Sequence, residues 1–132
     1  MVPPEIGSID ALVLCGGQGS RLKDIVPDRP KILAEIAGYP FAHYLLVYLE
    51  KEGLKRVILC TGYKHDKISE WISSSYNGNL DIVLSKEEVS LGTGGAIKNA
   101  QDLIYSNNFL VINGDTFTEI NYYKFVKYYS FE

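Results

Sequence analysis

The chain has 132 residues, of which 46% are hydrophobic and 22% are charged. This composition is typical of one soluble globular domain and excludes a disordered segment or a disulfide scaffold. The 13 basic and 16 acidic residues give a net charge of -3, so we expect no nucleic-acid partner and no membrane-binding face. No apolar run approaches the roughly 18 residues of a membrane span, and the first residues lack the features of a signal peptide. We therefore expect a cytoplasmic protein in which Cys15 and Cys60 are reduced core thiols.

Short apolar runs alternate with helical patterns along the chain. The runs predict buried strands at residues 11–15, 57–60, 80–84 and 109–112. The apolar spacing predicts helices at residues 40–49, 68–72, 96–104 and 122–129. Pro40 suits the first turn of the first helix, and Gly53 suits its exit. This alternation predicts an α/β fold with a mostly parallel sheet and helices on both of its faces.

Ligands of such sheets bind beyond the carboxyl ends of the strands, so the loops there are the candidates for chemistry. The loop after the first strand carries three glycines in four residues, Gly16, Gly17 and Gly19. They let backbone N–H groups approach a phosphate, and Arg21 and Lys31 can neutralise its oxygens. The loop matches neither a P-loop nor a dinucleotide fingerprint, because the required lysine and third glycine are missing. The alternative is a tight turn with two incidental basic residues.

Three segments resemble, in order, the motifs of the sugar-phosphate nucleotidyltransferases, also called sugar-nucleotide pyrophosphorylases. The first is LCGGQGSRL at 14–22 with PK at 30–31, the second is LGTGGA at 91–96, and the third is NGD at 113–115. Ser20 stands where that family often has threonine and keeps the hydroxyl. The resemblance covers about residues 11–123 and is strongest to the mannose-1-phosphate and D-glycero-D-manno-heptose 1-phosphate guanylyltransferases, which GYKH at 62–65 also resembles. It implies a Rossmann-like three-layer sandwich.

The resemblance also implies a reaction and a set of site residues. A nucleoside monophosphate passes from a nucleoside triphosphate to a hexose or heptose 1-phosphate, and pyrophosphate is released with Mg²⁺ between the phosphates. Arg21 and Lys31 are the implied catalytic cations, and Asp115 is the implied Mg²⁺ ligand. Taken alone, Asp115 is better explained as a turn residue or a helix cap, but its position after the fourth strand favours the metal-binding role. The implied nucleotide contacts come from Leu14, Gly16, Gly17, Gly19, Ser20, Glu87, Gly92 and Thr93.

Glu87 bears on which base is bound. In the family, the residue five positions before the glycine of LGT faces the base edge, and here that residue is Glu87. A carboxylate only accepts hydrogen bonds, and guanine offers two adjacent donors, whereas uracil and thymine offer one donor between two acceptors. Glu87 therefore favours GTP. The alternative is that residues 86–88 form a solvated charged loop.

We interpret residues 1–132 as a single nucleotide-binding, N-terminal part of a nucleotidyltransferase domain that is incomplete at its C-terminus, because the family's second half supplies the sugar pocket. A nucleotide-binding module without turnover is the alternative. An NAD-dependent dehydrogenase is excluded, because Thr61 stands where an acidic residue would follow the second strand.

We expect His43 and His65 at the surface or at helix ends. The stripe Tyr122, Phe125, Val126 and Tyr129 would be left uncovered and could form a homo-oligomer interface.

Overall fold

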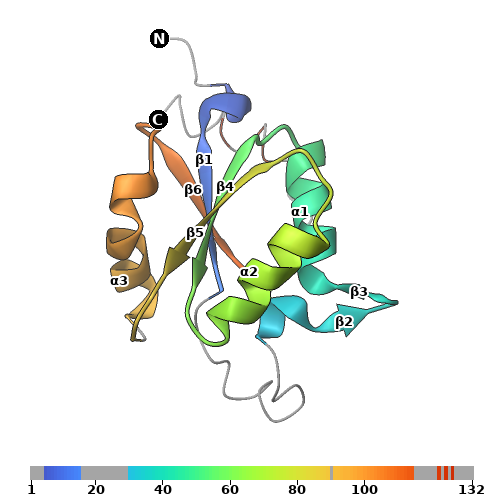
Figure 1. The fold of residues 1–132 in the computed structure, drawn as a ribbon. Helices are drawn as coiled ribbons and strands as arrows, with labels where there is room; N and C mark the ends of the chain where they lie inside the picture. The colour runs from blue at the N-terminus through green and yellow to red at the C-terminus, as the bar shows by residue number, and fades with distance from the viewer. Residues whose placement is uncertain are drawn as a thin grey trace.

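The computed structural model of the chain describes residues 5–15, 30–89 and 91–114, together with residues 122, 124 and 126. Its main sheet has the order β5-β4-β1-β6, and all neighbouring strands are parallel (Figure 1). The strands are β1 (Asp10–Leu14), β4 (Arg56–Thr61), β5 (Asp81–Lys86) and β6 (Phe109–Asn113). All four predicted strands are therefore confirmed, and the first and last lie side by side.

Helices cover both faces of this sheet, as predicted. The helices α1 (Phe41–Lys51) and α2 (His65–Ser74) lie on one face, and α3 (Gly92–Asn99) lies on the other (Figure 1). Side chains of β1 alternate between these layers: Ala11 and Val13 join the core under α1, whereas Leu12 and Leu14 pack toward α3. The result is the expected three-layer sandwich. Within the described residues, no helix is long and apolar enough to cross a membrane.

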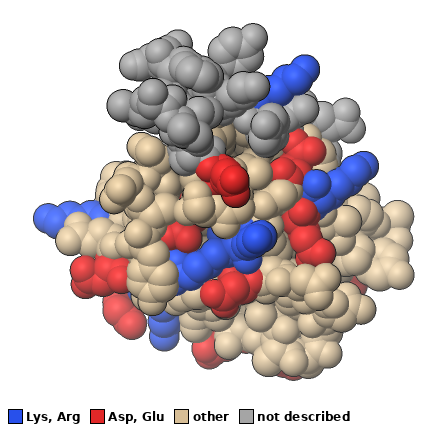
Figure 2. Space-filling view, turned by 90° about the horizontal axis from the view of Figure 1, so that it is seen from above, with Lys and Arg blue, Asp and Glu red and all other residues tan. Residues whose placement is uncertain are grey.

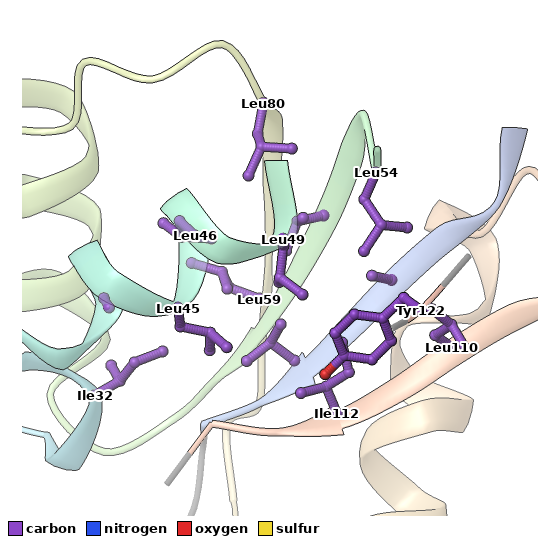
Figure 3. Close-up of a cluster of buried hydrophobic side chains, with 14 of the residues drawn as sticks. Ile32, Leu45, Leu46, Leu49, Leu54, Leu59, Leu80, Leu110, Ile112 and Tyr122 are labelled. Carbon is purple, nitrogen blue, oxygen red and sulfur yellow. The ribbon is translucent and has the colours of Figure 1, made fainter. Parts of the chain in front are cut away.

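The larger core lies between the sheet and α1, and it includes the last described residues of the chain. Tyr122 and Val126 are only 7% and 5% exposed, and the Tyr122 ring lies beside Leu110 and Ile112 of β6 (Figure 3). The Tyr122 amide donates to Glu52 Oε1 over 2.9 Å. The expectation that the aromatic stripe is uncovered is therefore wrong for these two residues, because both side chains are buried in the larger core. Phe125 and Tyr129 lie outside the described residues.

A short hairpin precedes α1 and was not predicted. It pairs β2 (Glu35–Ile36) with β3 (Tyr39–Pro40) through a turn at Ala37 and Gly38, both with positive φ. Pro40 consequently lies before the first turn of α1 as its N-cap, whereas Gly53 ends the helix at φ 105° as expected. The predicted helix over 96–104 is also displaced. Helix α3 begins earlier, at Gly92, and a separate 3₁₀ turn, η3 (Gln101–Leu103), follows it.

The end of the sheet where the strands begin is closed by a buried carboxylate. Asp10 is 5% exposed, and its Oδ2 accepts hydrogen bonds from the amides of Tyr105 (2.6 Å) and Ser106 (3.2 Å). The same oxygen lies 3.2 Å from Arg56 Nη1, and the guanidinium stacks 4.0 Å from the centroid of the Tyr105 ring. On the described part of this end, acidic and basic side chains are interspersed (Figure 2). These contacts join β1, β4 and the loop before β6, so their role is structural.

Candidate functional site

The carboxyl ends of β1 and β6 are drawn tightly together. The Gly114 amide donates to the Leu14 carbonyl oxygen over 2.9 Å. A Cβ at Gly114 would lie 3.0 Å from that oxygen and 3.1 Å from Val13 Cγ1, so this approach favours glycine. Cys15 and Gly114 are the last described residues before the glycine-rich loop and before Asp115, respectively, and a Cβ at Gly114 would also lie 3.3 Å from Cys15 Cβ.

The structure places five of the predicted site residues. Leu14 is the last residue of β1, and Glu87 directly follows β5. Gly92 and Thr93 are the first two residues of α3, and both are exposed. Helix α3 covers the face of the sheet toward which Leu14 packs. Lys31 opens a 3₁₀ turn, η2 (Lys31–Leu33), whose other residues join the core under α1 on the opposite face. The remaining predicted residues, Gly16, Gly17, Gly19, Ser20, Arg21 and Asp115, lie outside the described residues.

Glu87 is held inside the molecule. It is 8% exposed, whereas its neighbours Lys86 and Glu88 are exposed. Its amide donates to the Thr61 carbonyl oxygen over 2.7 Å, which continues the pairing of β5 with β4 by one residue. Its Oε2 accepts a hydrogen bond of 3.3 Å from the Leu91 amide, just before α3. The solvated-loop alternative is therefore wrong for Glu87, because the turn into α3 folds over its carboxylate.

The N-terminus of α3 presents open backbone beside this carboxylate. Gly92 adopts φ 73°, which favours glycine, and a Cβ at Gly92 or Gly94 would meet nothing within 4 Å. In contrast, a Cβ at Gly95 would lie 2.6 Å from Leu91 Cβ, so the helix can close on its cap residue only with glycine there. The first amides of a helix have no partner within the helix and are free to bind an acceptor. Glu87 and this helix start together offer both an acceptor and donors to a planar polar ligand.

Two neutral thiols lie near the carboxyl ends of the two central strands, β1 and β4. Burial, and then the negative charge of Glu87, raises the pKa of the Cys60 thiol to about 11. The pKa of Cys15 is raised by burial and, to a smaller extent, by Cys60 and Glu87. Both cysteines are free, as expected, and their side chains join cores on opposite faces of the sheet. The thiols therefore contribute apolar packing at this end of the sheet, and a nucleophilic role is not indicated.

A second set of polar contacts, which sequence reasoning missed, braces the ends of β4 and β5. The fully buried Thr61 hydroxyl lies 2.6 Å from His65 Nδ1 and 3.4 Å from the Ser85 carbonyl oxygen. Asn99 Nδ2 donates to the Lys86 carbonyl oxygen over 3.0 Å. His65 is the first residue of α2, as its expected helix-end position requires, but it has a partner that the sequence did not reveal. The only signal was the spacing of four residues between Thr61 and His65.

The described residues do not include a cluster of three or more metal-binding side chains. Within 5–15, 30–89 and 91–114, no group of three or more His, Cys, Asp or Glu side chains could hold a metal ion. Mg²⁺ commonly takes only one or two protein carboxylates and completes its shell with water and phosphate oxygens. The donor set that the sequence implies, one carboxylate at the end of β6, is of this kind.

Known proteins resemble this chain in sequence and in fold. Residues 10–130 match the family model described as nucleotidyl transferase. A D-glycero-alpha-D-manno-heptose 1-phosphate guanylyltransferase of Aneurinibacillus thermoaerophilus is 45% identical over 108 residues, and one of Campylobacter jejuni is 43% identical over 113 residues. These alignments cover 82% and 86% of this chain and 46% and 50% of the relatives, respectively.

The crystal structure of HddC from Yersinia pseudotuberculosis complexed with GMP-PN has the same fold. It superposes with a TM-score of 0.84 at 42% sequence identity, over 91% of this chain and 53% of that one. The chain thus spans about half the length of the relatives that it matches.

Proposed function

The chain belongs to the nucleotidyl transferase family, and on that premise we propose that it binds GTP at the carboxyl ends of β1, β4 and β5. The reaction it serves is GMP transfer to a hexose or heptose 1-phosphate. A phosphate oxygen of the sugar 1-phosphate attacks the α-phosphorus, the bond from that phosphorus to the β-phosphate oxygen breaks, and pyrophosphate leaves. Nucleotide sugar and pyrophosphate are the products.

The burial of Glu87 carries this proposal. Its carboxylate, 8% exposed and held beside the start of α3, is an acceptor that suits the N1–H and N2–H₂ donors of guanine. The open backbone at Gly92 and Thr93 would complete the base pocket. The guanylyltransferase names of the two relatives support the same base.

The phosphates would bind at the neighbouring strand ends. We propose that the backbone of Gly16, Gly17, Gly19 and Ser20 binds the triphosphate next to Leu14, and that Arg21 and Lys31 stabilise its charge. Asp115 would hold Mg²⁺, which offsets charge on the phosphate oxygens. The hydrogen bond from the Gly114 amide to the Leu14 carbonyl oxygen supports this pairing, because Asp115 directly follows Gly114 and the glycine-rich loop begins two residues after Leu14.

A second candidate is nucleotide binding without turnover by these residues alone. The observation that favours it is coverage, since the chain matches 46% and 50% of the two guanylyltransferases. Residues that bind the sugar phosphate would then come from a part of the protein beyond these 132 residues. For both candidates we propose a cytoplasmic location, in keeping with the two free thiols.

Calorimetry with GTP, ATP and UTP in the presence of Mg²⁺ tests the proposal. We expect GTP to bind most tightly and Glu87→Gln to lose that preference, whereas Glu88→Gln, on the exposed neighbour, keeps it. Pyrophosphate release with mannose 1-phosphate or heptose 1-phosphate then separates the two candidates. Preference for UTP, or no nucleotide binding at all, would contradict the proposed function.

A further inference from the structure

His65 is joined to Glu87 by a short chain of hydrogen bonds through Thr61. The side chain of Thr61 contacts His65 Nδ1 at 2.6 Å, and the backbone carbonyl of the same threonine accepts the Glu87 amide at 2.7 Å. Thr61 is 0% exposed, so no solvent competes for either contact. The start of α2 and the residue proposed to select the base are therefore held by one buried side chain and its own backbone.

The two contacts of the Thr61 hydroxyl can both be hydrogen bonds in only one assignment of protons. The Thr61 hydroxyl has one proton and lies near two partners, His65 Nδ1 and the Ser85 carbonyl oxygen. It can serve both only when Nδ1 carries a proton and donates to the hydroxyl, which then donates to Ser85 over 3.4 Å. In that arrangement the histidine orients the threonine, and the threonine ties the end of β4 to the end of β5.

The local backbone places the imidazole for this role. Lys64 adopts the left-handed conformation at φ 56°, and the His65 amide donates to the Gly62 carbonyl oxygen over 3.0 Å. This turn reverses the chain directly after β4 and returns the first side chain of α2 to the strand end. Left-handed backbone at a lysine is uncommon and carries a cost that the surrounding contacts must offset.

We propose that His65 is a positioning residue for base selection, which acts on Glu87 through Thr61. This inference rests on the proposed guanine contact of Glu87. Asn99 holds the Lys86 carbonyl from the α3 side, so Glu87 follows a strand end that is braced from both faces of the sheet. Removal of the His65 brace lets the Glu87 carboxylate shift relative to the Leu91 amide, and a displacement of this kind weakens a directional contact more than it weakens overall binding.

The first test needs no nucleotide. The Leu91 amide donates to Glu87 Oε2, so its proton chemical shift in the 132-residue chain reports the position of the carboxylate. We expect His65→Ala and Thr61→Val to shift this resonance in the same direction as Glu87→Gln. His65→Asn, which keeps a donor near the Nδ1 position, should restore it. His43→Ala is the matched control and should leave the Leu91 resonance unchanged. His43 lies on α1, and its ring stacks on the Tyr39 ring with 4.5 Å between the ring centroids. An unchanged Leu91 resonance in His65→Ala would overturn the proposal.

The second test measures base selection. ITP differs from GTP by the missing N2 amine. The dissociation constant of ITP divided by that of GTP therefore isolates one of the two donors proposed to bind Glu87. We expect His65→Ala and Thr61→Val each to lower this ratio by on the order of fivefold, since a hydrogen bond to a charged group contributes about a tenfold preference. The double variant of His65→Ala with Thr61→Val should be no worse than either single change. In a Glu87→Gln background, His65→Ala should have no further effect on the ratio.

The outcomes separate the inference from the function on which it rests. Equal weakening of GTP and ITP by His65→Ala, or a loss of stability with the ratio intact, would assign His65 a structural role only and overturn the inference. A wild-type chain that binds GTP and ITP equally would instead refute the base contact of Glu87 and the inference with it. Urea unfolding of each variant shows that the measured chains are folded, and His65→Asn and Thr61→Val keep the test decisive if His65→Ala fails to fold.

Discussion

The amide of Gly114 donates a 2.9 Å hydrogen bond to the carbonyl oxygen of Leu14. This contact joins the ends of two parallel strands that are separated by almost the whole described chain. The loops proposed to bind phosphates and metal follow these two strand ends directly. The close approach depends on the missing side chain at Gly114, which makes this glycine a direct test of how the site is held together.

Gly114→Ala should destabilise the protein by about 1–3 kcal/mol, as expected for overpacking against backbone and a buried side chain. The new Cβ would meet the Leu14 carbonyl oxygen at 3.0 Å and Val13 Cγ1 at 3.1 Å. Urea unfolding measures the change. Gly94→Ala is the control: its Cβ meets nothing within 4 Å, and alanine favours a helix, so stability should stay equal or rise slightly. Equal effects of the two changes would contradict the packing argument.

Arg56 offers a comparison of a buried and an exposed carboxylate partner. Asp10→Ala should cost about 3 kcal/mol of stability, because it leaves the amides of Tyr105 and Ser106 without their acceptor and Arg56 without its buried partner. Asp81→Ala should cost less than about 1 kcal/mol, because the Asp81 side chain is 70% exposed and lies 3.5 Å from Arg56 Nε. Chemical unfolding of both variants checks the contrast, and a larger effect at Asp81 would refute it.

Tyr122 tests whether the last described residues belong to the core. Tyr122→Ala should cost about 3 kcal/mol in the free energy of unfolding, because the ring is 7% exposed beside Leu110 and Ile112. Tyr122→Phe keeps the ring and its edge contact with Tyr48, so it should cost far less. If both changes were neutral, the docking of this segment on the sheet would be wrong.

The raised pKa of Cys60 predicts a pH dependence of stability. The folded protein holds the thiol proton more tightly than the unfolded chain, since the pKa rises from 9.0 to about 11. The contribution of Cys60 is therefore complete below pH 9 and is lost as the pH rises from 9 to about 11. The free energy of unfolding measured across this pH range should fall more steeply for the wild type than for Cys60→Ala.

Glu87→Gln removes the negative charge that is the smaller cause of the raised pKa of Cys60. The variant should therefore react faster than the wild type at the Cys60 thiol with an alkylating reagent.

The sequence predicted the helices and strands well where the signal was local. The four apolar runs became the four parallel strands, and the glycines that follow them lie at the carboxyl ends of these strands. The β2–β3 hairpin was missed because two-residue strands are too short for a periodic pattern, and Ala37 is not a typical turn residue for positive φ. The start of α3 was misplaced because three glycines in its first turn disguise a helix.

The candidate site divides in the same way. Residue types and spacing singled out Glu87, Gly92 and Thr93 because a family motif is a local pattern, and their role in binding stays a prediction. The burial of Glu87 under the turn at Leu91, the partner of His65 and the cover over Tyr122 depended on residues brought together from separate strands and helices. The apolar runs determine which segments become strands, and the glycines that follow these runs in the sequence lie at the carboxyl ends of those strands. Which polar side chains become buried, and against what, is decided only when parallel pairing brings the ends of distant strands together.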